Sequence, residues 1–504
     1  MELPKAIAAV LLLGSAYFFK KFLWKVRTSS VATLPGPWYS HYTDLVLRYH
    51  TLRARRIFYV HELHRRYGGV VRIAPNQVAV ADVAGVSQIH RIGSGFVKSA
   101  WYENFVSLTV AGIFAMRDPV MHGTRRKLFS RALSNSSLKT NWEPEVRRKV
   151  NLAVQKIKQD ALGSQKGADI FKWWTLMATD VVTHLSFGES FNMIEQGKVL
   201  LPVPFVSTII LTVRKQTPYI DALQKVTLDG LLRNEIPILR ALLRCIPLKQ
   251  LQDVFNAQDT VFTQSMVAVR NMRNGSGSSM NLFGQIIACA EDKEKDSLTE
   301  EDVKVEAGSF IIAGSDTTAV TMTYLTWAVL KQPDLRARLE DEIAQLSDEL
   351  TMAELEGASV LNSIIDETLR LYCAAPGALP RVVPKGGMAV SGYHIASGVE
   401  VSTQAYTNHR DPAVFPDPLQ FDGLRFLNKA AMTPAQKASF MPWGGGSRTC
   451  IGLHLALIEI RLATALFFRE CRGAKISECM RDEMMELENT FLVAPKSHCC
   501  YVSL

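Results

Sequence analysis

One short stretch, Trp443-Gly-Gly-Gly-Ser-Arg-Thr-Cys-Ile-Gly452, constrains this chain more than any other. It leads directly into LHLALIEIRLATALFF, whose apolar periodicity predicts a helix, so Cys450 should lie at or just before a helix N-terminus. There the helix dipole and the free amides favour a thiolate, and the glycines allow a tight turn that points backbone N–H groups at the sulfur. A solitary thiolate suits one metal position better than a four-ligand cage.

A haem group accounts for this loop. It needs one axial protein ligand, cations for its propionates, and amide hydrogen bonds that tune a sulfur donor. Cys450 and Arg448 supply the ligand and a cation. A lone cysteine is more often a small buried apolar residue, but Gly446, Arg448, Cys450 and Gly452 rarely occur together by chance, which favours the haem interpretation.

Composition sets broader limits. The 504 residues are 47% hydrophobic with a formal charge of +9, a balance typical of a globular protein. The basic residues form short clusters, which predict solvated helix faces or a positive surface for an acidic partner or anionic lipid, and no nucleic-acid motif occurs. The eight cysteines are scattered without a CxxC pair, so reduced thiols facing the cytosol are expected.

The N-terminal stretch predicts a membrane anchor over residues 1–27. An apolar run from Ala6 to Phe19 is followed by four basic residues, and no small-residue cleavage site of a signal peptide follows it. The run is short for a span, but lysine side chains can snorkel. Basic residues after the run predict a cytosolic body at the endoplasmic-reticulum membrane. Leu34-Pro-Gly-Pro37 predicts a stiff hinge over residues 28–37, followed by a single domain over residues 38–504.

The body is predicted to be mainly α with a minor β region. Apolar periodicity and turn residues locate the elements. In chain order, the expected elements are a hairpin that turns at Pro75-Asn76, mostly helices over residues 86–349 with loops at 135–137 and from Asn274, a long capped helix from Thr299 to Leu330, short strands over 382–404, one helix after Cys450, and an irregular tail.

A polar notch interrupts the apolar pattern of the long helix at Ala313-Gly-Ser-Asp-Thr317. A threonine within a helix can donate a hydrogen bond to the carbonyl four residues earlier, here that of Ala313. Gly314 removes the steric bar to opening the helix at this point. The notch is therefore expected to have room for dioxygen and a water molecule.

These motifs resemble those of the cytochrome P-450 family, whose ligand loop reads Phe-x-x-Gly-x-Arg-x-Cys-x-Gly. This chain supplies Trp443, Gly446, Arg448, Cys450 and Gly452 at the matching positions. Tryptophan replaces phenylalanine, which keeps an aromatic ring beside the sulfur and adds a donor, so the departure concerns redox tuning. The resemblance extends from Leu34-Pro-Gly-Pro37 nearly to the C-terminus. It implies the P-450 fold, with a long central helix over the haem and a small sheet.

Further positions match the family in order along the chain. Glu367 and Arg370 match its Glu-x-x-Arg pair, and Arg425 matches the third, arginine partner, although the proline and glutamate of that third motif are absent here. The resemblance gives these three residues a structural role. It implies that Cys450 ligates the iron of haem b and that Asp316 and Thr317 handle protons during catalysis. It also implies that Arg448, His122, Arg126 and Arg381 hold the haem propionates.

The resemblance implies a monooxygenase that inserts one oxygen atom from O2 into a lipophilic small molecule by hydroxylation or epoxidation, in one or several steps. YGGVVRIAPNQVAVAD and HRDPAVFPDP resemble filamentous-fungal members that tailor polyketides or terpenoids. Because no flavin or nucleotide motif occurs, NADPH electrons are expected through a separate membrane-bound flavoprotein reductase. Two alternatives remain: a reductase-independent isomerase or dehydratase, against which the intact Asp316-Thr317 pair argues, and a non-catalytic haem sensor or carrier.

The same resemblance predicts an apolar substrate pocket, which favours a bulky lipophilic substrate. The expected lining segments are residues 101–116 with Phe105 and Phe114, the 205–213 helix, Phe310, residues 377–379, and Phe491.

Overall fold

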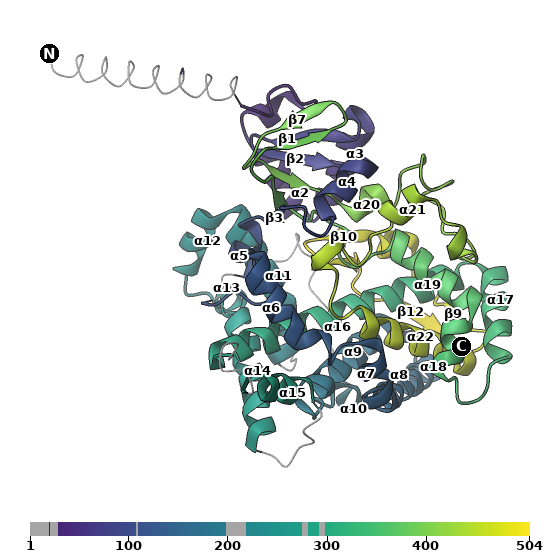
Figure 1. The fold of residues 1–504 in the computed structure, drawn as a ribbon. Coiled ribbons are helices and arrows are strands. Elements are labelled where there is room, and N and C mark those ends of the chain that lie inside the picture. The colour runs from purple at the N-terminus through teal and green to yellow at the C-terminus, as the bar shows by residue number, and fades with distance from the viewer. Residues whose placement is uncertain (1–19, 21–28, 107–108, 198–217, 275–280, 292–297) are drawn as a thin grey trace.

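The computed structural model describes residues 20, 29–106, 109–197, 218–274, 281–291 and 298–504. The predicted anchor, except Lys20, lies outside these residues, as do the 205–213 segment and most of the loop that begins at Asn274. Within the described ranges, no helix is long and apolar enough to span a bilayer. A sheet-rich part lies at one end of the molecule and a larger helical part fills the rest (Figure 1).

The sheet-rich part contains a five-stranded sheet in the order β1-β2-β8-β5-β3. Its hairpin, β1 (Val70–Ala74) and β2 (Gln77–Val80), is antiparallel with Val70 opposite Val80, so the predicted turn at Pro75-Asn76 is confirmed. The helices of this part and its remaining strands are α2 (Leu45–Leu52), α3 (Arg56–Tyr67), α4 (Val83–His90), β3 (Val97–Lys98), β5 (Arg381–Val382), β6 (Met388–Val390), β7 (Tyr393–Ile395) and β8 (Glu400–Ser402).

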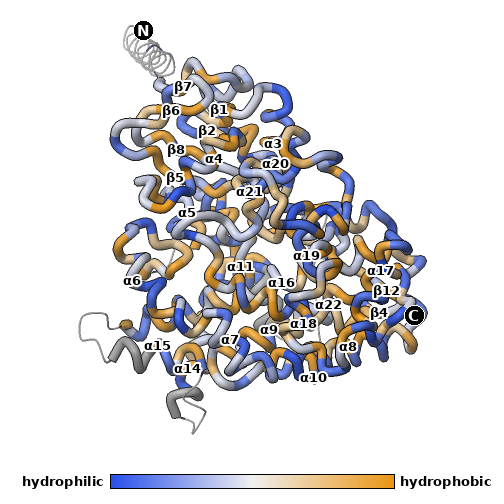
Figure 2. The backbone as a smooth tube through the Cα atoms, turned by 45° about the vertical axis from the view of Figure 1, so that its right-hand side comes forward, coloured by the Kyte–Doolittle hydropathy of each residue, from blue (hydrophilic) through white to orange (hydrophobic). Residues whose placement is uncertain are grey.

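The helical part is built around α16 (Glu300–Leu330), which packs along α9 (Ile170–Phe187) and against α22 (Leu453–Glu470). These three helices meet in the interior and carry much of the main apolar core (Figure 2). The Thr299 hydroxyl caps α16 by accepting from the Asp302 amide, and the Asp302 carboxylate accepts from the Thr299 amide in return. This capping box confirms the predicted start of the long helix.

The other helices surround this centre. They are α5 (Trp101–Val106), α6 (Pro119–Ser130), α7 (Asn135–Asn141), α8 (Glu143–Gly163), α10 (Met193–Gln196), α11 (Pro218–Glu235), α12 (Pro237–Arg244), α13 (Lys249–Phe255), α14 (Ala257–Asn274), α15 (Leu282–Glu291), α17 (Pro333–Ala344), α18 (Met352–Gly357), α19 (Ser359–Leu371), α20 (Ala405–Asn408) and α21 (Pro434–Ser439). The predicted mainly α fold with a minor β region is therefore confirmed.

Two local predictions were wrong. Residues 135–137 form the first turn of α7 and no loop, because the Ser134 hydroxyl caps that helix by accepting from the Ser137 amide. The C-terminal tail is not irregular: it contains β9 (Lys475–Ile476), β10 (Leu487–Asn489), β11 (Val493–Pro495) and β12 (Tyr501–Ser503). β12 pairs with β9 and with β4 (Ala168–Asp169), and the second of these partners is distant in sequence.

The segment around Leu34 is packed against the sheet. The Arg72 guanidinium, with only 2% of the residue exposed, donates to the Leu34 carbonyl at 2.6 Å and to the Val31 carbonyl at 3.1 Å. The described part of the predicted hinge is thus a fixed part of the body.

Candidate active site

The loop before Cys450 has the geometry that its glycines predict. Gly444 and Gly446 adopt φ values of +71° and +62°, which are unfavourable for other residues, and a short 3-10 turn follows at Gly446–Arg448. The Cys450 amide then donates to the Trp443 carbonyl at 2.8 Å. This bond closes the loop and delivers Cys450 three residues before the first residue of α22.

Cys450 is exposed in this structure. Surrounding protein atoms nevertheless desolvate its thiol, and this burial raises the pKa of the thiol above the usual value. Three groups lower the pKa of this thiol but do not outweigh burial, namely the Gly452 amide, the Leu453 amide and the Arg126 guanidinium. The helix start alone therefore does not favour the thiolate, and a metal cation at the sulfur would be needed to remove its proton.

Five basic side chains gather near this loop: Lys98, His122, Arg126, Arg381 and Arg448. Within the described residues none of them forms an ion pair with a carboxylate. Burial and mutual repulsion lower the pKa of His122 to about 3 and that of Arg448 to about 10. Burial, with repulsion from Arg381 and Arg448, also lowers the pKa of Lys98 well below its usual value. Such a group of partly buried cations is unfavourable unless an anion lies among them.

Three of these basic side chains donate hydrogen bonds to uncharged oxygen atoms, which fix their positions but do not compensate their charge. Arg448 donates to the Met116 carbonyl at 2.7 Å, and Arg381 donates to the Tyr102 hydroxyl at 3.0 Å. Lys98 donates to a main-chain carbonyl, and its residue lies opposite Arg381 in the pairing of β3 with β5. Sequence reasoning missed Lys98, because only this strand pairing brings it beside the other cations.

The residues present therefore fit a haem. Its propionates would supply the negative charge that these five basic side chains lack as a partner, and the exposed Cys450 would offer its sulfur to the iron. The burial of the cations strengthens this fit, since solvent does not screen them fully.

The predicted notch lies in the middle of α16. The Thr317 hydroxyl donates a hydrogen bond to the Ala313 carbonyl at 2.8 Å. Ala313 is exposed, although it lies near the middle of this largely buried helix. The helix nevertheless remains continuous through Gly314, where an added Cβ would lie 2.8 Å from the Val182 side chain. Gly314 therefore serves close packing of α16 on α9 and does not open the helix.

Burial raises the pKa of Asp316 to about 6, with His498 acting in the opposite direction. A carboxyl group with this pKa exchanges its proton readily near neutral pH. Asp316 and Thr317 thus combine a proton-exchanging acid with an oriented hydroxyl on one helix, and α16 packs against the helix that follows Cys450.

Glu367, Arg370 and Arg425 form one ion-pair cluster. The fully buried Arg370 and Glu367 pair through two 2.7 Å hydrogen bonds, and Arg425 reaches the same carboxylate at 3.1 Å. Arg370 also donates to main-chain carbonyls of the segment between α20 and α21, including that of His409 at 2.7 Å. The cluster forms even though the expected proline and glutamate are absent before Arg425.

The predicted lining residues fall into two aromatic clusters. Trp101 stacks on Phe105 at 4.8 Å between ring centres, and Phe491 lies 5.3 Å from Phe105 and 5.7 Å from Phe114. Phe310 belongs to the second cluster, where it packs on Phe129 of α6 at 4.9 Å between ring centres. That Phe310 also lines the substrate pocket stays a prediction.

An exposed cysteine just before a helix, basic side chains without ion pairs beside it, and Asp316 with Thr317 on α16 fit one class of protein, namely those that hold a haem through a single cysteine. The chain belongs to the cytochrome P450 family, whose sequence model matches residues 36–500.

Three curated relatives from fungi are similar to this chain over nearly its whole length. The chain is 38% identical to cytochrome P450 monooxygenase stcB of Emericella nidulans over 94% of this chain and 88% of that protein. It is 37% identical to cytochrome P450 monooxygenase aflV of Aspergillus parasiticus over 100% of this chain and 99% of that protein. It is also 38% identical to cytochrome P450 monooxygenase tazI of Aspergillus terreus, over 96% of this chain and 95% of that protein. All three of these relatives are named as cytochrome P450 monooxygenases.

Proposed function

We propose that the protein is an NADPH- and O2-dependent haem-thiolate monooxygenase that tailors a lipophilic fungal metabolite, such as a polyketide or terpenoid. The main support is the exposed Cys450 just before α22, which lies beside basic side chains that form no ion pair with a carboxylate of the described residues. In this proposal Cys450 would ligate the iron of haem b. Its propionates would be held by Arg448, Arg381, Arg126, His122 and Lys98. The names of the fungal relatives support the same reaction class.

The bound haem would supply the reduction of dioxygen and the insertion of one oxygen atom into the substrate. The chain's own residues would manage protons. The Thr317 hydrogen is engaged by the Ala313 carbonyl, so its oxygen lone pairs remain free to accept a hydrogen bond. Asp316, whose pKa burial raises to about 6, can take a proton from solvent and release it inward.

The ion-pair cluster of Glu367, Arg370 and Arg425 would act structurally. Its bonds to main-chain carbonyls tie α19 to the segment that leads into the Cys450 loop. We therefore assign it the task of holding that loop in position and no direct part in the chemistry.

Electrons would come from NADPH through a separate membrane-bound flavoprotein reductase. The test is NADPH oxidation by the purified protein with such a reductase, with and without a candidate substrate. A substrate-dependent rate with matching oxygenated product supports the monooxygenase. Product formation without reductase identifies an isomerase or dehydratase, and neither activity with retained haem identifies a sensor or carrier.

We also propose that residues 1–27 anchor the protein in the endoplasmic-reticulum membrane with the catalytic body in the cytosol. The apolar run and the basic residues after it support this location. Ile238 and Leu242 on α12 add support, since 78% and 63% of these residues are exposed. Alkaline extraction of membranes should leave the full chain in the pellet and release a chain that lacks residues 1–27.

A further inference from the structure

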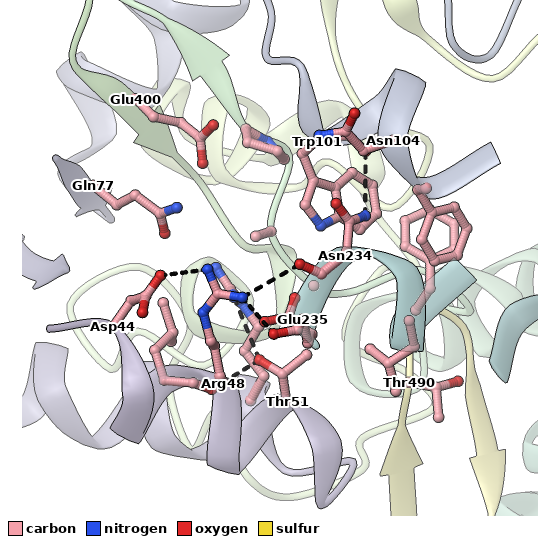
Figure 3. Close-up of a pocket in the computed structure, with 18 of the residues that line it drawn as sticks. Asp44, Arg48, Thr51, Gln77, Trp101, Asn104, Asn234, Glu235, Glu400 and Thr490 are labelled. Carbon is pink, nitrogen blue, oxygen red and sulfur yellow. Dashed lines mark hydrogen bonds and ion pairs between the residues drawn. The ribbon is translucent and has the colours of Figure 1, made fainter. Parts of the chain in front are cut away.

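A half-open cavity of about 290 Å³ lies between α2, the start of α5, the end of α11 and strands of the five-stranded sheet (Figure 3). One side is polar, with Arg56, Gln77, Glu235 and Glu400 in its lining. The other side contains Trp101 with Phe105 and Phe491. Sequence reasoning anticipated the aromatic side but not the polar side, whose residues come from distant parts of the chain.

The polar side holds groups whose hydrogen bonding is incomplete within the described residues. The Arg56 guanidinium has five N–H donors, yet its one hydrogen bond there is a long contact of 3.5 Å to the Thr51 hydroxyl. The Gln77 side-chain oxygen is buried without a partner. Glu235 is 8% exposed, and its carboxylate accepts no hydrogen bond from the described part of the chain. Buried polar groups in this condition need partners, which water or a ligand can supply.

A neighbouring arginine does not share this condition. Arg48 pairs with Asp44 at 2.8 Å and donates to the Asn234 and Glu235 carbonyls, as the dashed lines in Figure 3 show. The Asp44–Arg48 pair therefore contributes no net charge and leaves few donors for a ligand.

The remaining charges disfavour an anion. Arg56 carries one positive charge, and the carboxyl groups of Glu235 and Glu400 both act on it electrostatically. Burial raises the pKa of both carboxyl groups, but even one ionised carboxylate cancels the arginine. A cavity without net positive charge that offers both donors and acceptors suits a neutral ligand with hydroxyl and carbonyl groups.

The aromatic side connects this cavity with the haem site. The Phe491 ring lies 5.6 Å from Trp101 and 5.7 Å from Phe114. The Lys98 ammonium, one of the five basic groups near the Cys450 loop, lies 4.7 Å from the centre of the Phe114 ring. A continuous row of aromatic contacts thus runs from the cavity to the proposed propionate-binding cations, and these flat surfaces suit a ring system.

We propose that this cavity selects the substrate, and that the substrate class is a neutral ring compound with hydroxyl and carbonyl groups at one end. Its polar end binds to Arg56, Gln77 and Glu235, and its ring body lies on Trp101 and Phe491 on the way to the haem. The inference rests on the proposed monooxygenase function and adds to it the chemistry that the substrate must carry.

The test is isothermal titration calorimetry of the haem-loaded full chain with a dihydroxynaphthalene, its dimethyl ether and naphthoate. We expect the dihydroxy compound to bind about tenfold more tightly than the ether, the effect of one added hydrogen bond to a charged group. Glu235→Gln and Arg56→Gln, which alter two different helices, should each reduce this preference to about threefold or less. The exposed neighbours give matched controls, Arg55→Gln and Glu62→Gln, which should keep the full preference.

Four results would overturn the inference: equal binding of the dihydroxy compound and its ether, tightest binding of naphthoate, a preference that survives both cavity substitutions, or no binding of either neutral probe. The proposed function fails separately. A chain without a cysteine-ligated haem refutes that function whatever the calorimetry shows, whereas a normal haem spectrum without hydroxyl preference refutes only the selection by this cavity.

Discussion

Gly446 lies too close to a neighbouring backbone for any side chain. A Cβ at this position would sit 1.9 Å from the His90 carbonyl oxygen, and the residue has a φ of +62°. Gly444, two residues earlier, has a similar φ of +71°, but a Cβ there would meet nothing closer than the Arg448 carbonyl at 3.7 Å. Gly444→Ala and Gly446→Ala therefore share the backbone strain and differ in the clash alone.

The magnitudes follow from these distances. The left-handed conformation costs an alanine about 1–2 kcal/mol, and both variants should lose that much free energy of unfolding. Gly446→Ala must also separate the Cβ from the His90 oxygen by roughly 1.5 Å more to reach ordinary contact. Metal–ligand bonds tolerate deviations of only about 0.2 Å, so a shift of this size in a loop that ends at Cys450 should disrupt ligation of the iron.

The assay is the carbon-monoxide difference spectrum of each variant, normalised to total haem, together with thermal unfolding. Gly444→Ala should keep the red-shifted band of cysteine-ligated haem and unfold at a somewhat lower temperature. Gly446→Ala should lose most of that band while its far-ultraviolet circular dichroism stays helical. Equal, near-normal bands in the two variants would refute the reasoning, because the Cys450 loop would then not depend on its contact with His90.

Three further predictions concern single side chains. Thr317→Ala should keep its haem but divert NADPH electrons to hydrogen peroxide. Thr321→Ala, which removes the same type of hydrogen bond one turn later, should keep NADPH oxidation coupled to product formation. Tight coupling of NADPH oxidation to product in Thr317→Ala would count against the proton role of Thr317. Burial raises the pKa of Glu306 to about 7, so the folded state favours its protonated form and stability should fall as the pH rises from about 4.5 to about 7, by up to about 3 kcal/mol. Urea unfolding of Glu306→Gln should lack this slope, and an unchanged slope would assign it to other groups. Glu367→Ala leaves its fully buried arginine partner without a carboxylate and should lose about 3–5 kcal/mol of unfolding free energy. Glu62→Ala at an exposed pair should lose about 1 kcal/mol or less, and similar losses in the two would contradict the assigned role.

Features that depend on neighbouring residues were predictable from the sequence. The Thr299 capping box, the bond from Thr317 back to Ala313 and the glycine loop before Cys450 are all set by spacings of a few residues. Long periodic segments such as α16 and α22 were predictable for the same reason, because their apolar spacing repeats over many turns.

Features that depend on distant pairing were not predictable. Lys98 lies beside Arg381 only because two-residue strands pair across the sheet. The strands of the C-terminal tail are similarly short, and β12 finds a partner in β4 far back along the chain. The error at residues 135–137 had a local cause, since polar residues typical of loops also start helices when a capping serine precedes them.

The most direct test of the central claim is the carbon-monoxide spectrum of Cys450→Ser. We expect the wild-type protein to show the red-shifted band of cysteine-ligated ferrous haem and the variant to lose it. An unchanged band in the variant, or a wild-type protein that binds no haem, would contradict this claim.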